Sequence, residues 1–256
     1  MTEKENMAQE VEKKEPAASD CRFCKRPSQC PKCKEELDLE KPGEKTDIDG
    51  KVVDIYKQLP PFPEPLPPVH PQNYHCMPPE APIFQEFSVF FAGSIEMGKA
   101  IQWQQQLAVH LQDLPISMYN PRRGKWDPKA TQDAKNEAFR HQVEWELDAL
   151  QKAKVICFFF DWTTMSPVTL CELGLWAHSA KVVVCCDRRY WKGGNVHLVC
   201  ERYGIPLVEK FTDLEVLIRA MLGQKGLKVD GLPSEEVLKA AGQKAPKLKT
   251  AELGTA

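Results

Sequence analysis

The chain has 256 residues, and its 34 basic and 36 acidic side chains leave a net charge of −2. This balance excludes a protein that holds nucleic-acid polymers on a basic face. No apolar stretch approaches the ~18 residues of a membrane-spanning helix, and the charged first residues lack the apolar core of a secretory signal. Ten cysteines in a chain without such a signal indicate free thiols in a reducing compartment. We therefore expect a soluble cytoplasmic protein that does not bind membranes.

Proline is unevenly distributed, because the first third of the chain holds 14 of the 21 prolines. We predict a disordered Cys- and Pro-rich region over residues 1–83, in which residues 59–82 run as extended polyproline II. The long apolar runs follow, and they predict one folded domain over residues 84–222. Residues 223–256 return to Gly, Pro and Lys and predict a flexible tail, with one short helix near residues 234–241.

Between these flanks, short continuous apolar runs alternate with helical patterns. Buried strands are expected at residues 87–92, 116–119, 155–160, 182–186 and 206–208. Helices are expected at residues 99–114, about 139–150, 167–179, 195–203 and 214–221. Such alternation predicts an α/β domain with a parallel sheet of five strands that helices cover on both faces. Sheets of this kind bind ligands at the carboxyl ends of their strands, so candidate site residues are sought there.

One acidic residue does not fit its surroundings. The expected helix that starts with Ser166 as its N-cap and Pro167 as its first residue is apolar almost all round, yet it contains Glu172. No basic residue lies within a helical turn of this glutamate, and burial of an unpaired carboxylate is costly. Two interpretations remain open: a structural carboxylate that backbone amides or a distant arginine satisfy, or a functional one.

A second acidic residue lies in the preceding helix. Glu146 continues the apolar stripe of Val143 and Leu150, so it is expected on or beside the buried face. Asp148 lies two residues further on and is expected to point nearer Trp145 and His141. Acidic residues on the core-facing sides of consecutive helices can converge, and paired carboxylates in a cleft are what cleavage of a glycosidic bond uses. The two glutamates together suggest a site, although each also has a structural interpretation.

Small and polar residues follow the first two expected strands. Gly93 and Ser94 form a turn whose amides and hydroxyl suit a sugar hydroxyl or a phosphate, although such turns are common. Asn120, Arg122 and Arg123 follow the second strand at the same end of the sheet. Two adjacent arginines suit an anionic group of a substrate, and a surface ion pair is the alternative.

Two further loops carry candidate contacts to a substrate. Trp126 and Asp127 suit a loop that covers and hydrogen-bonds a base or a ribose, and an ordinary packed loop is the alternative. Asn195 follows Gly193 and Gly194 before an expected helix and is equally ambiguous.

Four cysteines near the start of the chain, Cys21, Cys24, Cys30 and Cys33, form two CxxC pairs. This arrangement suits a tetrahedral zinc site with thiolate ligands. The spacer of five residues between the pairs is short for such a site, so cysteines without a metal are the other interpretation. We predict no bound metal and no cofactor.

The chain contains, in this order, the segments FFAGSIEMGKAIQWQ, MYNPRRGKWD, FRHQVEWELDAL, SPVTLCELGLWA and GGNVHLVCERYGI. Together these segments, within about residues 87–210, resemble the nucleoside 2-deoxyribosyltransferase family. They are most similar to its type 2-like branch, which is found in microbes and fungi. The resemblance implies a flavodoxin-like (Rossmann-like) five-stranded parallel sheet, and chemistry at C1′ of a nucleoside or nucleotide.

The resemblance also implies roles for individual residues. The family's nucleophilic glutamate lies in an ELG segment and matches Glu172. The acidic residue that assists the leaving base matches Glu146, with Asp148 as the alternative. The end of the first strand, which contacts the sugar in the family, matches Gly93 and Ser94.

Ser166 stands where some transferases carry an aspartate, which leaves the base specificity and the transferase activity itself open. Family members complete their sites across a dimer interface. A homodimer or higher homo-oligomer is therefore implied, with Asn195 as a donor to the partner's site.

We therefore predict an enzyme of nucleotide metabolism or salvage, a nucleoside deoxyribosyltransferase or an N-glycoside hydrolase. It cleaves or exchanges the N-glycosidic bond of a (deoxy)nucleoside or its 5′-monophosphate through a glutamyl intermediate. Arg122 and Arg123 favour the 5′-monophosphate, because guanidinium groups bind phosphate through charge-assisted hydrogen bonds. The alternative is a catalytically silent nucleotide-binding or scaffold module that works through its Pro- and Cys-rich N-terminal region.

Overall fold

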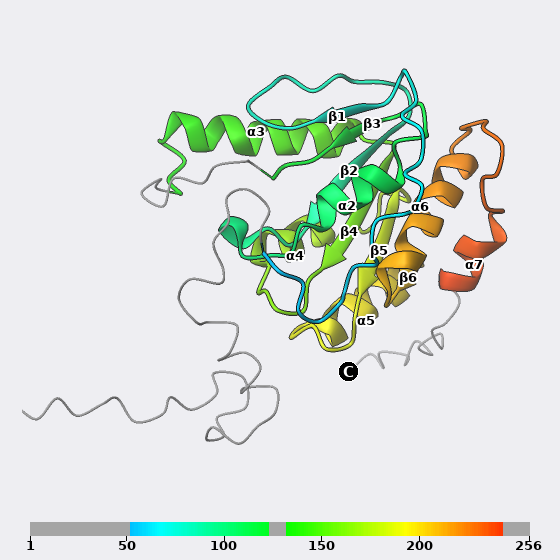
Figure 1. Cartoon of the computed structure of the whole chain (residues 1–256). Helices are drawn as coiled ribbons and strands as arrows, with labels where there is room; N and C mark the ends of the chain where they lie inside the picture. Colours follow the sequence, from blue (N-terminus) through cyan, green and yellow to red (C-terminus); the bar gives the residue numbers. More distant parts are fainter. Residues whose placement is uncertain (1–51, 123–131, 243–256) are drawn as a thin grey trace, which may run out of the picture. The chain divides into compact units, whose positions relative to one another are not determined.

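The computed structural model describes residues 52–122 and 132–242, which form the fold shown in Figure 1. The four cysteines of the possible zinc site lie outside the described residues, and so do Arg123, Trp126 and Asp127. Among the helices that are described, none has the length and apolar character needed to cross a membrane.

Six parallel strands form one sheet, in the order β1-β3-β2-β4-β5-β6. The central strands are continuous apolar runs because each is buried on both faces. The strands are β1 (Tyr74–Cys76), β2 (Ser88–Gly93), β3 (Ser117–Tyr119), β4 (Val155–Phe160), β5 (Val182–Cys186) and β6 (Leu207–Val208). The predicted α/β domain with a parallel sheet is confirmed, and the five expected strands correspond to β2 to β6.

Helices connect the strands and follow the last one. In the described residues they are η1 (Glu96–Gly98), α2 (Trp103–His110), α3 (Glu137–Lys152), α4 (Pro167–Trp176), α5 (Gly193–Tyr203), α6 (Phe211–Gln224) and α7 (Glu236–Gly242). α7 confirms the short helix predicted in the tail. The helix expected over residues 99–114 is shorter than predicted, because residues 99–102 form a loop whose carbonyls bind a buried side chain, described below.

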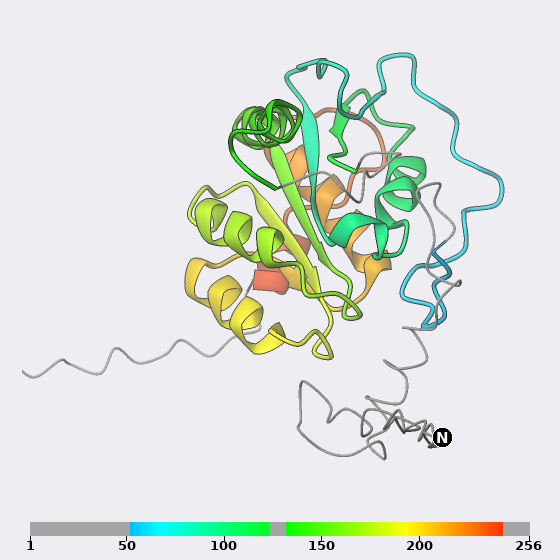
Figure 2. The ribbon, with the colours of Figure 1, turned by 90° about the vertical axis from the view of Figure 1, so that its left-hand side faces the viewer.

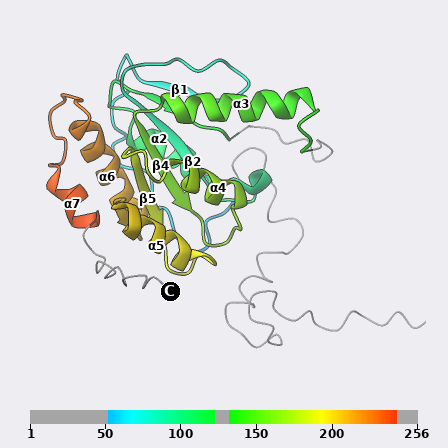
Figure 3. The same cartoon turned by 180° about the vertical axis from the view of Figure 1, so that it is seen from behind.

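The helices form two layers, one on each face of the sheet (Figures 2 and 3). Alternate side chains of the strands point to opposite faces and so belong to two hydrophobic clusters. Val89 and Phe91 of β2 pack with α2, α6 and α7 on one face. Phe90 and Ala92 pack with α3, α4 and α5 on the other.

The prediction of a disordered region that reaches residue 83 is wrong for residues 52–83. Within that segment, β1 pairs with β3 as an additional edge strand. The Asn73 amide donates to the carbonyl of Leu114 at 2.9 Å, and Trp145 Nε1 donates to the carbonyl of Glu80 at 2.8 Å. Sequence reasoning missed β1 because it has three residues, of which only one is buried. The folded domain therefore begins before residue 84.

Candidate active site

Glu172 lies in α4, where its side chain is half-buried. Thr169 and Leu173 are the buried residues of this helix, and Glu172 lies beside the side that they form. Burial, together with the negative charge of Glu146, raises the pKa of Glu172 from 4.5 to about 8. No positive charge within the described part of the chain offsets this shift. The carboxyl group is therefore in an environment that disfavours its ionised form.

Glu146 lies in α3, the helix before α4 in the chain. Gln142, one turn earlier, donates its side-chain amide to Glu146 Oε1 at 2.6 Å and to the carbonyl of Pro121 at 3.1 Å. A neutral amide orients the carboxylate without removing its charge. The negative charge of Glu146 contributes to the raised pKa of Glu172. The two glutamates that the sequence pattern singles out are therefore electrostatically coupled in the fold.

Asp148, the alternative acidic residue of α3, is exposed. It lies beside Leu147, whose residue surface is 47% exposed. The buried residues of α3 are Gln142, Trp145, Ala149 and Leu150. Of the two acidic candidates in this helix, Glu146 rather than Asp148 contributes to the raised pKa of Glu172.

Ser94 and Ser166, predicted as separate contacts to a substrate, lie together in the loops that follow β2 and β4. Their hydroxyl oxygens are 2.6 Å apart, and the hydroxyl of Thr164 lies 2.8 Å from that of Ser166. The backbone N–H of Asp161 donates to Ser94 Oγ at 2.9 Å. Both serines are buried, so their hydroxyl groups join the two loops to each other.

The backbone of Ser166 also differs from expectation. Ser166 occupies the N-cap position of α4, as predicted, but its φ of 46° is left-handed and its side chain makes no capping bond. Its carbonyl still accepts from the N–H of Leu170 at 3.1 Å, in the first turn of the helix. A left-handed backbone is costly for a residue other than glycine, on the order of 1 kcal/mol or more. The hydroxyl contacts to Ser94 and Thr164 compensate by holding the residue in place.

Gly93 is required by packing rather than by the approach of a ligand. A Cβ at this position would lie 2.5 Å from the carbonyl oxygen of Phe159 and 2.5 Å from Cζ2 of Trp103. Neither the strand backbone nor the buried indole can move away cheaply. The close contact between β2, β4 and α2 therefore explains this glycine.

Arg122 has a different role from the predicted one. Its buried guanidinium donates to the carbonyls of Ile101 at 2.8 Å, Ala100 at 2.8 Å and Gly98 at 3.3 Å. Burial lowers the pKa of Arg122 to about 10, and the negative charge of Asp161 opposes that shift. Because its donors bind backbone carbonyls, Arg122 cross-links the loop before α2. The interpretation of Arg122 as a ligand for an anionic substrate group is corrected accordingly.

The two predicted asparagines have unequal surroundings. Asn120 is buried, its Oδ1 accepts from the N–H of Arg122 at 3.0 Å, and its Nδ2 lies 3.1 Å from His75 Nε2. It therefore holds the turn after β3. Asn195 is exposed in the first turn of α5.

Sequence reasoning missed two polar residues that organise this region. Gln142 lies four residues before Glu146, which is the spacing at which helical side chains meet, so the pattern contained the signal. Asp161 directly follows the buried strand β4, at the end of the sheet where ligands are expected, and it is fully buried. An acidic residue in that position is the signal that was available for Asp161.

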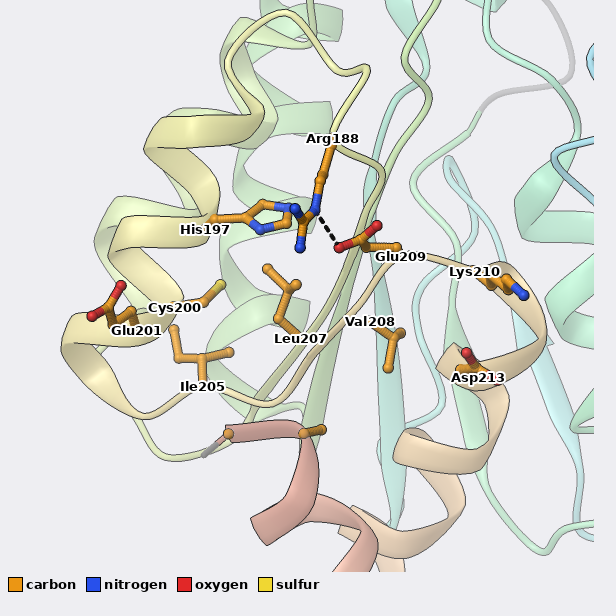
Figure 4. Close-up of a pocket in the computed structure, with 12 residues that line it drawn as sticks. Arg188, His197, Cys200, Glu201, Ile205, Leu207, Val208, Glu209, Lys210 and Asp213 are labelled. Carbon is orange, nitrogen blue, oxygen red and sulfur yellow. Dashed lines mark hydrogen bonds and ion pairs between the residues drawn. The ribbon is translucent and has the colours of Figure 1, made fainter. Parts of the chain in front are cut away.

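A separate groove lies between α5, β6 and the start of α6 (Figure 4). Arg188 Nε donates to Glu209 Oε1 at 2.8 Å on its rim, and Cys200, Ile205 and Leu207 are among its other lining residues. None of the predicted site residues lines this groove. The ion pair on the rim of this groove leaves those two charges partnered, and the other lining is largely apolar. We therefore look for the chemistry between α3 and α4, where the two glutamates lie.

Residues 86–190 match the family described as nucleoside 2-deoxyribosyltransferase like. This part of the chain is therefore similar to that family. The matched residues contain both glutamates and the hydroxyl contacts of Ser94 and Ser166, and they indicate a nucleoside deoxyribosyltransferase-like activity. The family resemblance drawn from the sequence is confirmed. No curated protein matches the chain.

Proposed function

We propose that this chain cleaves or exchanges the N-glycosidic bond of a nucleoside or nucleotide, with Glu172 as nucleophile and Glu146 as general acid and base. One observation carries the proposal: two carboxyl groups from consecutive helices interact within the residues that match the family. A fold without this chemistry has no need to bury a carboxyl group whose ionised form is disfavoured by a second acidic side chain.

The protonation state of the pair supports these roles. With a pKa of about 8, Glu172 is mostly protonated at neutral pH, while Glu146 is negatively charged. The pair of carboxyl groups therefore shares one proton and one negative charge. The reaction needs that same total: one ionised carboxylate to attack C1′ and one proton for the leaving base. In the productive complex the proton lies on Glu146, and transfer between neighbouring carboxyl groups accomplishes the exchange.

The reaction then proceeds in two displacements. The Glu172 carboxylate bonds to C1′ as the C1′–N bond breaks, and the departing base takes its electron pair together with the proton of Glu146. A second base or a water molecule attacks C1′ of the resulting ester. Glu146 accepts the proton of the attacking molecule as the ester bond breaks, which restores Glu172 and the original configuration. Transferase and hydrolase differ in which molecule attacks the ester.

The nature of the 5′ substituent is open to a direct test. The sequence predicts a preference for 5′-monophosphates from Arg122 and Arg123, but the guanidinium of Arg122 binds carbonyls of its own loop. The prediction now depends on Arg123, which lies outside the described residues. A comparison of kcat/KM for a nucleoside and its monophosphate, with wild type and Arg123→Ala, tests it. Equal use of both substrates would refute the preference.

We also propose that the chain works as a homodimer. Val168 and Leu175 of α4 are 63% and 53% exposed, and they lie on the same side of the helix as Glu172. Apolar side chains beside a reactive carboxylate suit a second copy that covers the site. A mixture of inactive Glu172→Gln and Asn195→Ala proteins tests this arrangement. Activity recovered in the mixture would support shared sites, and a monomer in sedimentation would contradict them.

A second candidate function is a binding module without turnover. Phe62, Leu66 and Val69 are exposed apolar side chains in the Pro-rich segment, and they favour docking of a partner. One experiment separates the two candidates: incubation with a panel of nucleosides and 5′-monophosphates, with and without a second free base. Free base alone indicates a hydrolase, and exchanged base indicates a transferase. No reaction with any substrate of the panel would refute the enzymatic proposal.

A further inference from the structure

Residues 52–60, which we call the strap, lie outside the matched range yet contact the candidate site region (blue in Figure 1). Gln58 Nε2 donates to Asp161 Oδ1 at 2.9 Å. The ring of Tyr56 packs against that of Trp162, with centroids 5.9 Å apart. Leu59 packs on the hydrophobic cluster of α2 and α6. The strap is therefore attached both to the core and to the loop after β4.

The carboxylate of Asp161 is the point at which the strap meets two other segments. In addition to Gln58, Asp161 Oδ1 accepts from the N–H and the hydroxyl of Thr163, at 2.9 and 2.8 Å. Asp161 Oδ2 accepts from the N–H of Ile101 at 3.1 Å. Asp161 is fully buried, and these four donors satisfy its two carboxyl oxygens. One carboxylate thus joins the strap, the loop after β2 and the loop after β4.

The two loops that Asp161 joins border the proposed catalytic pair. Ser94 begins the loop after β2, and Ser166 ends the loop after β4, where their hydroxyl groups meet. α4 starts at the next residue, Pro167, and carries Glu172 in its second turn. A displacement of Asp161 therefore shifts the start of the helix that positions Glu172.

We infer that Gln58 and Asp161 are positioning residues, through which the strap aligns the two loops and α4 for catalysis. This inference rests on the proposed function. Small displacements of the two loops matter, because a misplacement of about 1 Å can cost roughly 10²-fold in rate. Neither residue is assigned contact with the substrate.

The test uses the full chain and measures kcat of base release. Gln58→Glu replaces the amide donor by a carboxylate that faces Asp161, and Gln58→Ala removes the donor without adding charge. We expect kcat to fall about tenfold or more in Gln58→Glu and less in Gln58→Ala. Gln85→Ala is the matched control, because the Gln85 amide binds the carbonyl of Gln72, away from the site. Unchanged kcat in Gln58→Glu, or an equal loss in the control, would overturn the inference.

A double variant tests whether Gln58 acts through Asp161. In Gln58→Glu with Asp161→Asn, the new asparagine amide can donate to the new glutamate, which restores one bond with reversed polarity. We expect the double variant to lose less activity than the product of the two single losses predicts. Independent, multiplicative losses would contradict a direct coupling.

Hydrogen exchange at the Ile101 amide provides a readout that does not need turnover. We expect Gln58→Glu to speed this exchange about tenfold, since Ile101 donates to the same carboxylate, and Gln85→Ala to leave it unchanged. If wild type releases no base, the proposed function fails, and exchange still decides the inference. If exchange at Ile101 is unaltered in Gln58→Glu, the strap does not position this loop.

Discussion

The two helix layers that cover the sheet differ in how their partly buried charged side chains are paired. Between α2 and α6, Arg219 pairs with Asp113 at 2.7 Å and with Glu215 at 2.9 Å, while His110 Nδ1 lies 2.7 Å from Glu215. These carboxylates raise the pKa of Arg219 although burial opposes the shift. Each partly buried charge in this network therefore has an opposite partner, which is the arrangement that stabilises a fold.

Between α3 and α4, two acidic side chains affect each other instead. The charge of Glu146 adds to burial in raising the pKa of Glu172, and exposed Val168 and Leu175 flank the latter residue. Such an arrangement destabilises the folded chain when both groups are ionised. One layer is therefore arranged for stability, while the other carries a cost in stability that a function would explain.

The largest expected effect follows from removal of the proposed nucleophile. Glu172→Gln keeps the shape of the side chain but cannot form the ester, so we expect base release to fall by at least ~10³-fold. The same variant should melt at a higher temperature, because it removes a carboxyl group that burial destabilises. Steady-state kinetics and calorimetry check both effects. Glu144→Gln, an exposed position on α3, is the control that should change neither.

The second prediction concerns the N-terminal boundary. A chain that starts at residue 84 lacks β1 and the strap, so the edge of β3 and the carbonyl of Leu114 lose their partners. We expect it to be unfolded or aggregated at 25 °C, whereas a chain that starts at residue 43 keeps these contacts. Circular dichroism and gel filtration compare the two. A stable, active chain from residue 84 would refute this boundary.

Removal of the proposed general acid should have the next largest effect. We expect Glu146→Gln to lower base release by roughly 10²- to 10⁴-fold. It should also lower the pKa of Glu172, since the opposing negative charge is gone. Carboxyl ¹³C NMR titration measures that pKa. Asp148→Asn is the discriminating control, and a loss in it comparable to that in Glu146→Gln would transfer the role to Asp148.

The same pKa predicts how stability depends on pH. The folded pKa of Glu172 is about 8, against 4.5 for the free side chain, so the folded chain binds more protons than the unfolded one between these values. Its contribution to the free energy of unfolding is therefore present below about pH 4.5 and lost as pH rises toward 8. We expect a smaller decline in Glu172→Gln when urea unfolding is measured at pH 5, 6.5 and 8. An identical decline in both proteins would contradict the raised pKa.

The smallest effect is expected in the layer whose charges are paired. Arg219→Ala leaves Asp113 and Glu215 without their cation, and we expect it to lower the free energy of unfolding by about 1–3 kcal/mol. Base release well below the melting temperature should be unchanged, because α2 and α6 lie on the opposite face from the glutamates. Urea unfolding and kinetics together separate stability from function. A kinetic defect as large as that of Glu146→Gln would erase the contrast between the two layers.

The sequence predicted what depends on regular patterns and missed what depends on tertiary contacts. β4 and β5 match their expected bounds because a short continuous apolar run between two turns is typical of a strand that is buried on both faces. The interaction of Glu146 with Glu172 could be predicted, because helical spacing determines which side of a helix each residue occupies. The hydrogen-bond partners of Arg122 could not be predicted from the sequence, since a guanidinium binds backbone carbonyls and phosphates through the same donors. Ser94 and Ser166 are 72 residues apart, and only the folded sheet brings them together.

The central claim is that Glu172 forms a covalent bond to the sugar. Its most direct test is to quench the protein with acid during turnover of a nucleoside and to measure the mass of the peptide that contains residue 172. The proposed function predicts an added pentosyl or deoxypentosyl mass on Glu172 in wild type, more of it in Glu146→Gln if breakdown of the ester is slowed more than its formation, and none in Glu172→Gln. Normal base release by Glu172→Gln, or a sugar adduct on a different residue, would contradict it.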